Sequence, residues 1–169
     1  MDSFTLQLGR IVRRLFVMPR FKTCIRRAVQ LTKVRILLAD DHPGFTEMAE
    51  HYLEPEFEIV GKVADGQSLF DAAMRLEPEI VVTDISMPVL NGIEAAEQLE
   101  EAGCKSRIIF LTVHLGADFV QRCISIGAFG FVVKSRIATE LVPAVRDALA
   151  GHVFVSQSRP MVGEQLSCT

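Results

Sequence analysis

The chain has 169 residues, 49% of them hydrophobic, which is enough for one ordinary globular domain and short for two of typical size. Its four cysteines form no CxxC pair and lie at no close spacing with histidine, so a zinc site, a redox motif and a secreted disulfide scaffold are disfavoured. No apolar run approaches the roughly 18 residues of a membrane span, and we expect a cytoplasmic protein.

The first 33 residues differ in charge from the rest of the chain. They carry eight basic side chains against Asp2, a charge of +7, which leaves −10 on the remainder of a chain whose net charge is −3. Apolar residues in segments 4–18 and 21–29 recur at helical spacing, so we predict a basic amphipathic N-terminal extension over residues 1–33. Three interpretations stay open: a segment that contributes little to the domain, a helix that docks on a partner, an anionic membrane or nucleic acid, and a targeting peptide.

From Val34 onward, strand patterns alternate with helix patterns. Short runs rich in β-branched residues predict strands, and apolar residues three or four positions apart predict helices. The expected strands are residues 34–39, 57–63, 80–83, 107–112 and 130–133. The expected helices are residues 43–54, 67–76, 92–102, 118–126 and 138–150. Because neighbouring parallel strands need a crossover helix, this order predicts an α/β fold with a doubly wound, five-stranded parallel sheet.

Proline and glycine mark the ends of several predicted elements. Pro43 suits the first turn of a helix, and Gly103 suits the position just after one. Pro143 would kink a helix interior, but it falls near the first turn if Thr139 caps the last helix. Few large apolar residues follow, so we expect residues 153–169 to form a C-terminal tail.

Polar side chains follow four of the predicted strands. Asp40 and Asp41 come after the first, Asp84 after the third, Thr112 ends the fourth and Lys134 follows the fifth. The carboxyl ends of parallel strands lie at one edge of a sheet, where ligands bind in open α/β folds. Three clustered carboxylates need a cation to stay ionised together, and Mg²⁺ or Mn²⁺ suits such oxygen ligands. The sequence thus predicts a divalent metal site at this edge.

This set of residues is suited to phosphoryl chemistry. A carboxylate beside Mg²⁺ can attack a phosphoryl group and form an aspartyl phosphate. The ammonium of Lys134 and the hydroxyl of Thr112 would help to neutralise the charge on the phosphoryl oxygens. His42 could be a further metal ligand, but it has no partner histidine beside a hard oxygen site, so we interpret it as a loop residue near the pocket.

These motifs, in this order, resemble the response-regulator receiver domain of bacterial two-component signalling. The resemblance covers residues 34–152 and rests on the aspartate pair, on Asp84 with Met87-Pro88 and Gly92 after it, and on the threonine and lysine. It implies a flavodoxin-like fold with strand order 2-1-3-4-5. Segments 39–43 (Ala-Asp-Asp-His-Pro), 84–88 (Asp-Ile-Ser-Met-Pro) and 112–114 (Thr-Val-His) resemble the subfamily usually joined to a LuxR-type helix-turn-helix, an output domain we expect to be missing here.

The resemblance also implies a role for each site residue. Asp84 would accept a phosphoryl group from a sensor histidine kinase. Asp41, Asp84 and the Ser86 carbonyl would bind Mg²⁺, and Asp40 would assist, through water. Lys134 would contact the phosphoryl group, Thr112 would swing toward it and Phe131 would follow inward as the aromatic switch residue. Ser86 and His114 would tune the lifetime of the phosphoryl group.

Ser135 departs from the family pattern. Many receivers have a proline after the lysine, often with a cis bond, and a cis bond before serine would cost roughly 3–4 kcal/mol. The resemblance therefore leaves open whether the Lys134–Ser135 bond is cis or trans.

The leading hypothesis is a phosphorylation-switched signalling module that is not itself an enzyme beyond its own phosphorylation and dephosphorylation. The face formed by helix 118–126, strand 130–133 and helix 138–150 would be read by an unidentified output protein or by a second copy in a homodimer. One alternative is a Mg²⁺-dependent phosphatase of the haloacid dehalogenase type, whose DxD signature is absent because Ile85-Ser86 follows Asp84. Another is a DNA-binding transcriptional regulator that uses the basic extension or a missing output domain.

Overall fold

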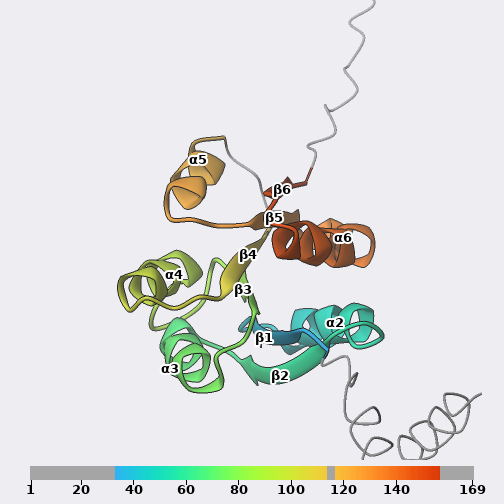
Figure 1. Ribbon diagram of the computed structural model, residues 1–169, viewed down its shortest axis with the longest axis horizontal. Coiled ribbons are helices and arrows are strands. Elements are labelled where there is room, and N and C mark those ends of the chain that lie inside the picture. Colours follow the sequence, from blue (N-terminus) through green and yellow to red (C-terminus); the bar gives the residue numbers. More distant parts are fainter. Residues whose placement is uncertain (1–32, 114–116, 157–169) are drawn as a thin grey trace, which may run out of the picture. The chain divides into compact units, whose positions relative to one another are not determined.

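The computed structural model describes residues 33–113 and 117–156, which build a parallel sheet covered by helices on both faces (Figure 1). The strands are β1 (Arg35–Ala39), β2 (Glu58–Val63), β3 (Ile80–Asp84), β4 (Arg107–Thr112), β5 (Gly130–Val133) and β6 (Phe154–Val155). The helices are α2 (Pro43–Leu53), α3 (Gly66–Leu76), α4 (Gly92–Glu101), α5 (Ala117–Ser125) and α6 (Ile137–Leu149), with a 3₁₀ turn η2 (Lys134–Arg136) before α6. The strand order is β2-β1-β3-β4-β5-β6, which confirms the predicted order 2-1-3-4-5 and the flavodoxin-like class.

Two apolar layers enclose the sheet. Helices α2 and α6 pack on one face around Leu53, Ile137 and Leu141, and α3, α4 and α5 pack on the other around Leu69, Leu99 and Cys123 (Figure 1). All residues of β3 are buried, as expected for a central parallel strand that contacts helices on both faces. Within the described residues, no helix is long and apolar enough to cross a membrane.

The C-terminal end of the sheet differs from the sequence prediction. We expected a tail over residues 153–169, but Phe154 and Val155 form a sixth strand that pairs in parallel with Gly130 and Phe131. The Ser156 amide donates to the Phe131 carbonyl, and its hydroxyl accepts from the Val133 amide and contacts the Glu140 carboxylate. This strand forms because the free edge of β5 offers unpaired backbone groups. Two residues are too few to produce a recognisable strand pattern in the sequence.

The last helix also begins earlier than predicted. Arg136, not Thr139, is its N-cap residue, and the Thr139 hydroxyl donates to the Arg136 carbonyl from within the first turn. Pro143 therefore lies inside the helix. Gly103 follows α4 with a φ of 75°, the left-handed conformation predicted for a residue that ends a helix. The predicted extension over residues 1–33 lies outside the described residues apart from Lys33.

A capping aspartate starts α3 and gives a first test of the fold. Asp65 accepts from the Ser68 amide at 2.8 Å and from the Ser68 hydroxyl at 2.7 Å. These bonds, led by the one from the backbone amide, hold the pKa of Asp65 below its ordinary value. We predict that Asp65→Ala lowers the free energy of unfolding by about 1 kcal/mol at neutral pH, because the α3 amides lose their acceptor.

The stability difference between wild type and Asp65→Ala should depend on pH in a predictable direction. A depressed pKa stabilises the fold above the unfolded-state value, and that contribution is lost as the pH falls through the folded-state pKa. The difference in the free energy of unfolding between wild type and Asp65→Ala, measured by urea denaturation, should therefore become smaller in acid. Asp65→Asn, which keeps an acceptor that does not titrate, should stay close to wild type. Equal stability of wild type and Asp65→Ala at neutral pH would contradict this account.

Candidate functional site

The register of the parallel strands brings the predicted polar residues to one edge. Ala39 pairs with Thr83, Asp84 with Leu111, and Thr112 with Val133, so β1, β3, β4 and β5 end at nearly the same level. The residues at or just after these ends therefore lie together. The structure places Asp40, Asp41, Asp84, Thr112 and Lys134 at this carboxyl edge of the sheet.

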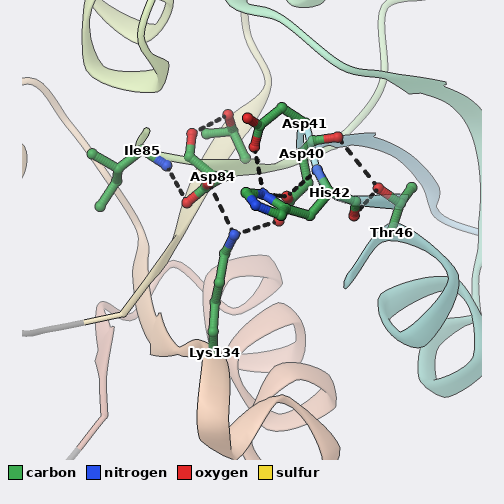
Figure 2. A network of polar contacts seen from close by, with 8 residues as sticks. Asp40, Asp41, His42, Thr46, Asp84, Ile85 and Lys134 are labelled. Atoms are coloured by element: carbon green, nitrogen blue, oxygen red, sulfur yellow. Dashed lines mark hydrogen bonds and ion pairs between the residues drawn. The ribbon is translucent and has the colours of Figure 1, made fainter. Parts of the chain in front are cut away.

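Lys134 connects two of the buried aspartates. Its ammonium lies 2.7 Å from Asp40 Oδ2 and 2.9 Å from Asp84 Oδ2. Figure 2 shows the ammonium between the two carboxylates. Only 5% of the Lys134 side chain is exposed, and 3% and 6% of the two aspartate side chains. The ammonium also lies 4.4 Å from the centre of the Phe45 ring, which stabilises the cation and covers it from solvent. These contacts fix the charged end of Lys134 between the carboxylates.

Backbone contacts fix the orientation of Asp84. Its Oδ1 accepts from the Ile85 amide at 2.7 Å, while Oδ2 faces Lys134. Gly92 at the start of α4 donates to the Ile85 carbonyl, and a Cβ atom at this position would lie 2.0 Å from the Asp84 carbonyl oxygen. Only a residue without a side chain can approach so closely. Gly92 is thus needed to place α4 against the loop that carries the aspartate.

The carboxylates meet the requirements of a hard divalent cation. Ligand atoms of Asp40, Asp41, His42 and Asp84 all lie within 4.8 Å of one another. Asp40 Oδ2 is buried and makes no regular hydrogen bond in the described structure, its polar contact being the ion pair with Lys134. Mg²⁺ prefers oxygen ligands and is held by few carboxylates while it keeps several waters. The donor set therefore fits Mg²⁺ or Mn²⁺.

A pocket of about 360 Å³ opens above these residues. Its lining includes Asp84, Ser86, Thr112 and Lys134, so a phosphoryl group that enters it reaches the aspartate, a hydroxyl and the ammonium. Ser86 is exposed at this pocket. A cavity of about 420 Å³ lies beside Cys104 at the amino ends of β3 and β4, and it is separate from this site.

The two predicted switch residues lie on neighbouring strands. Thr112 is 8% exposed at the end of β4. Phe131 on β5 is fully buried and stacks on Phe110 at a centroid distance of 5.9 Å, so its ring already occupies an inward position. The predicted tuning residue His114 lies outside the described residues.

The structure adds two residues that the sequence analysis did not place in the site. Phe45 on α2 covers Lys134, and the Nδ1 atom of His42 lies 2.7 Å from Asp41 Oδ1. His42 was interpreted as a loop residue near the pocket, and the loop position is correct. Its entry into the carboxylate cluster depends on a side-chain rotamer that no sequence pattern records. Pro43, which starts α2 directly after it, is the one local signal that fixes its backbone.

A 2-1-3-4-5 parallel sheet with three aspartates and a lysine at its carboxyl edge defines a flavodoxin-like α/β domain of the receiver class. The chain belongs to the response regulator receiver domain family, which it matches over residues 36–146. It is therefore a receiver domain of the two-component response regulators, and this assignment favours the leading hypothesis over the phosphatase alternative.

Individual relatives support the same assignment. The chain is 30% identical over 129 residues to the transcriptional regulatory protein DegU of Brevibacillus brevis, an alignment that covers 75% of this chain and 55% of DegU. It is 29% identical over 125 residues to the nitrate/nitrite response regulator protein NarL of Escherichia coli strain K12, covering 73% and 58%. A LuxR-family two-component response regulator from Aurantimonas sp. SI85-9A1 superposes with a TM-score of 0.68 at 34% identity, covering 72% and 89%. The chain thus spans a little over half the length of DegU and NarL.

The close approach of Gly92 gives a test of how the site is held. We predict that Gly92→Ala lowers the free energy of unfolding by about 1–3 kcal/mol, because the added methyl group displaces the backbone of Asp84. Gly44→Ala in α2 is the matched control, since nothing lies within 4 Å of its added Cβ and alanine favours a helix. In urea denaturation, the free energy of unfolding should be lower than that of wild type for Gly92→Ala and higher for Gly44→Ala. A Gly92→Ala variant as stable as wild type would refute the close approach.

Proposed function

We propose that this chain is a response regulator that accepts a phosphoryl group on Asp84 in a Mg²⁺-dependent reaction and so controls a partner. The observation that carries the proposal is the Lys134 ammonium in contact with the buried carboxylates of Asp40 and Asp84, at a pocket of about 360 Å³ that Thr112 also lines. Three ionised carboxylates and one ammonium sum to −2, the charge that one divalent cation balances. Family membership supports the same reaction.

Asp84 is the nucleophile of the proposed reaction. One of its carboxylate oxygens attacks the phosphorus of a phosphohistidine on a sensor histidine kinase, a new O–P bond forms and the P–N bond breaks. The electron pair of that bond returns to the kinase imidazole, which leaves with the proton it takes from water. The hydrogen bond from the Ile85 amide keeps the carboxylate aligned before attack.

The other side chains neutralise charge around the phosphoryl group. From its place between Asp40 and Asp84, the Lys134 ammonium contacts one oxygen of the phosphoryl group. The Thr112 hydroxyl donates a hydrogen bond to another oxygen. Asp41, Asp84 and the Ser86 carbonyl would hold Mg²⁺, and Asp40 would assist through water. When bound, Mg²⁺ supplies the positive charge that the phosphoryl oxygens require. Ser86 and His114 would set the lifetime of the aspartyl phosphate.

The switch is proposed to act through Thr112 and Phe131. Movement of Thr112 toward the phosphoryl group would open space beside β4 and so stabilise the buried position that the Phe131 ring already holds against Phe110. The surface that reports this change is formed by α5, β5 and α6. A second copy or an unidentified output protein would read it, and β6 on the edge of β5 lies within reach of such a partner.

Residues outside the receiver fold are given separate roles in this proposal. We assign residues 34–156, which include β6, to the receiver unit and residues 1–33 to a basic segment. If the protein binds nucleic acid or an anionic membrane, the basic segment would make that contact. DegU is named as a transcriptional regulatory protein, and a gene-regulatory output for this chain rests on that likeness.

The decisive experiment is intact mass after incubation with a small acyl phosphate. We expect wild type to gain one phosphoryl group with Mg²⁺ and none with a chelator, and Asp84→Asn to gain none under either condition. Asp71→Asn is the matched control, because it removes an exposed carboxylate on α3 away from the pocket, and it should be phosphorylated like wild type. Equal phosphorylation of wild type and Asp84→Asn would overturn the proposal.

A further inference from the structure

His42 lies where a ligand of the divalent cation would lie. Its Nδ1 atom is 2.7 Å from Asp41 Oδ1 and 3.5 Å from Asp40 Oδ1. Adjacent ligands of an octahedral ion at 2.0–2.1 Å are about 3 Å apart, and the 2.7 Å between His42 Nδ1 and Asp41 Oδ1 is close to that length. Figure 2 shows the imidazole lying among the carboxylates of Asp40, Asp41 and Asp84.

The backbone and a neighbouring ring hold His42 in this place. The His42 amide donates to Asp40 Oδ1 at 2.9 Å, and the residue is the N-cap of α2, which Pro43 begins. The ring meets the Phe45 ring edge to face at 6.2 Å, and Phe45 also covers Lys134. A hydrogen bond from Nδ1 to the Asp41 carboxylate needs the ring proton on Nδ1. Because the imidazole is 65% exposed, that proton can pass to Nε2 when an ion binds, which frees the Nδ1 lone pair for the ion.

We propose that His42 Nδ1 is a further protein ligand of this cation site, which gives the site a mixed nitrogen and oxygen donor set. This inference rests on the proposed metal site of Asp41 and Asp84. An imidazole adds little for Mg²⁺, a hard ion that prefers oxygen, but it binds Co²⁺ and Ni²⁺ well. The chain should therefore bind borderline divalent metals more tightly, relative to Mg²⁺, than its carboxylates alone would allow.

The competing interpretation is that His42 only orients Asp41 through the 2.7 Å hydrogen bond. Under that interpretation His42 is a positioning residue, and its loss weakens every metal alike. Asparagine distinguishes the two roles, because its amide can donate to Asp41 but cannot offer an imidazole nitrogen. A positioning role therefore survives His42→Asn, whereas a ligand role does not.

The test is calorimetric titration of the untagged full-length chain with Mg²⁺, Co²⁺ and Ni²⁺. Outer-sphere partners of metal ligands are already worth 10–100-fold in affinity, so loss of a direct ligand should cost at least about tenfold. We expect His42→Asn to lose about that much Ni²⁺ and Co²⁺ affinity and to keep Mg²⁺ affinity within about twofold. The visible spectrum of bound Co²⁺ should also shift as nitrogen is replaced by oxygen. His51→Asn removes an exposed imidazole from α2 and is the control. It should change neither the metal affinities nor the Co²⁺ spectrum.

The possible failures are distinguishable. If His42→Asn leaves the ratio of Ni²⁺ to Mg²⁺ affinity unchanged while Asp41→Asn weakens Mg²⁺ binding, the ligand role of His42 is wrong and the proposed cation site stands. A parallel loss for all three metals in His42→Ala, restored in His42→Asn, would identify a positioning residue and overturn the inference. If wild type binds Mg²⁺ no better than Asp41→Asn or Asp84→Asn, the proposed function itself loses its metal site.

Discussion

The buried contact between Lys134 and two aspartates is the interaction on which the rest of the site depends. Like charges in a dry environment are unfavourable unless a cation lies between them. The ammonium at 2.7 Å from Asp40 and 2.9 Å from Asp84 supplies one positive charge, and the third carboxylate, Asp41, leaves the cluster short of positive charge. This deficit is what makes the edge of the sheet receptive to a divalent cation, and it is a consequence of the charges that the strands deliver.

The fold maintains this arrangement by aligning the strand ends and by packing α2 and α4 against the site. Parallel pairing of β1, β3, β4 and β5 brings four strand ends to one level, so no long loop is needed to gather the polar groups. Gly92 lets α4 begin directly against the Asp84 backbone, and Phe45 from α2 covers the lysine. Elements on both faces of the sheet therefore hold the charges at fixed separations, which preorganises the site for a charged ligand.

Features that depend on local pattern were predictable from the sequence, and features that depend on tertiary contact were not. The apolar runs of β1, β3 and β4, with the acids at the ends of β1 and β3 and the threonine at the end of β4, predicted the sheet and its polar edge, because burial on both faces leaves a continuous run of apolar residues. The sixth strand was missed because Phe154 and Val155 gain their pairing only from the exposed edge of β5. The position of His42 Nδ1 beside Asp41 was missed because it depends on a rotamer and on Phe45, four positions from Asp41.

The most direct test of the central claim is the free energy of unfolding of the chain as Mg²⁺ is added at constant ionic strength. A cation that binds only the folded carboxylate cluster stabilises the fold, by about 2.7 kcal/mol at a hundredfold excess over its Kd. The account predicts a steady rise in the denaturation midpoint for wild type and no rise for Asp41→Asn, whose partly exposed carboxylate faces the cluster without supporting the core. A wild-type midpoint that does not respond to Mg²⁺ would contradict the account.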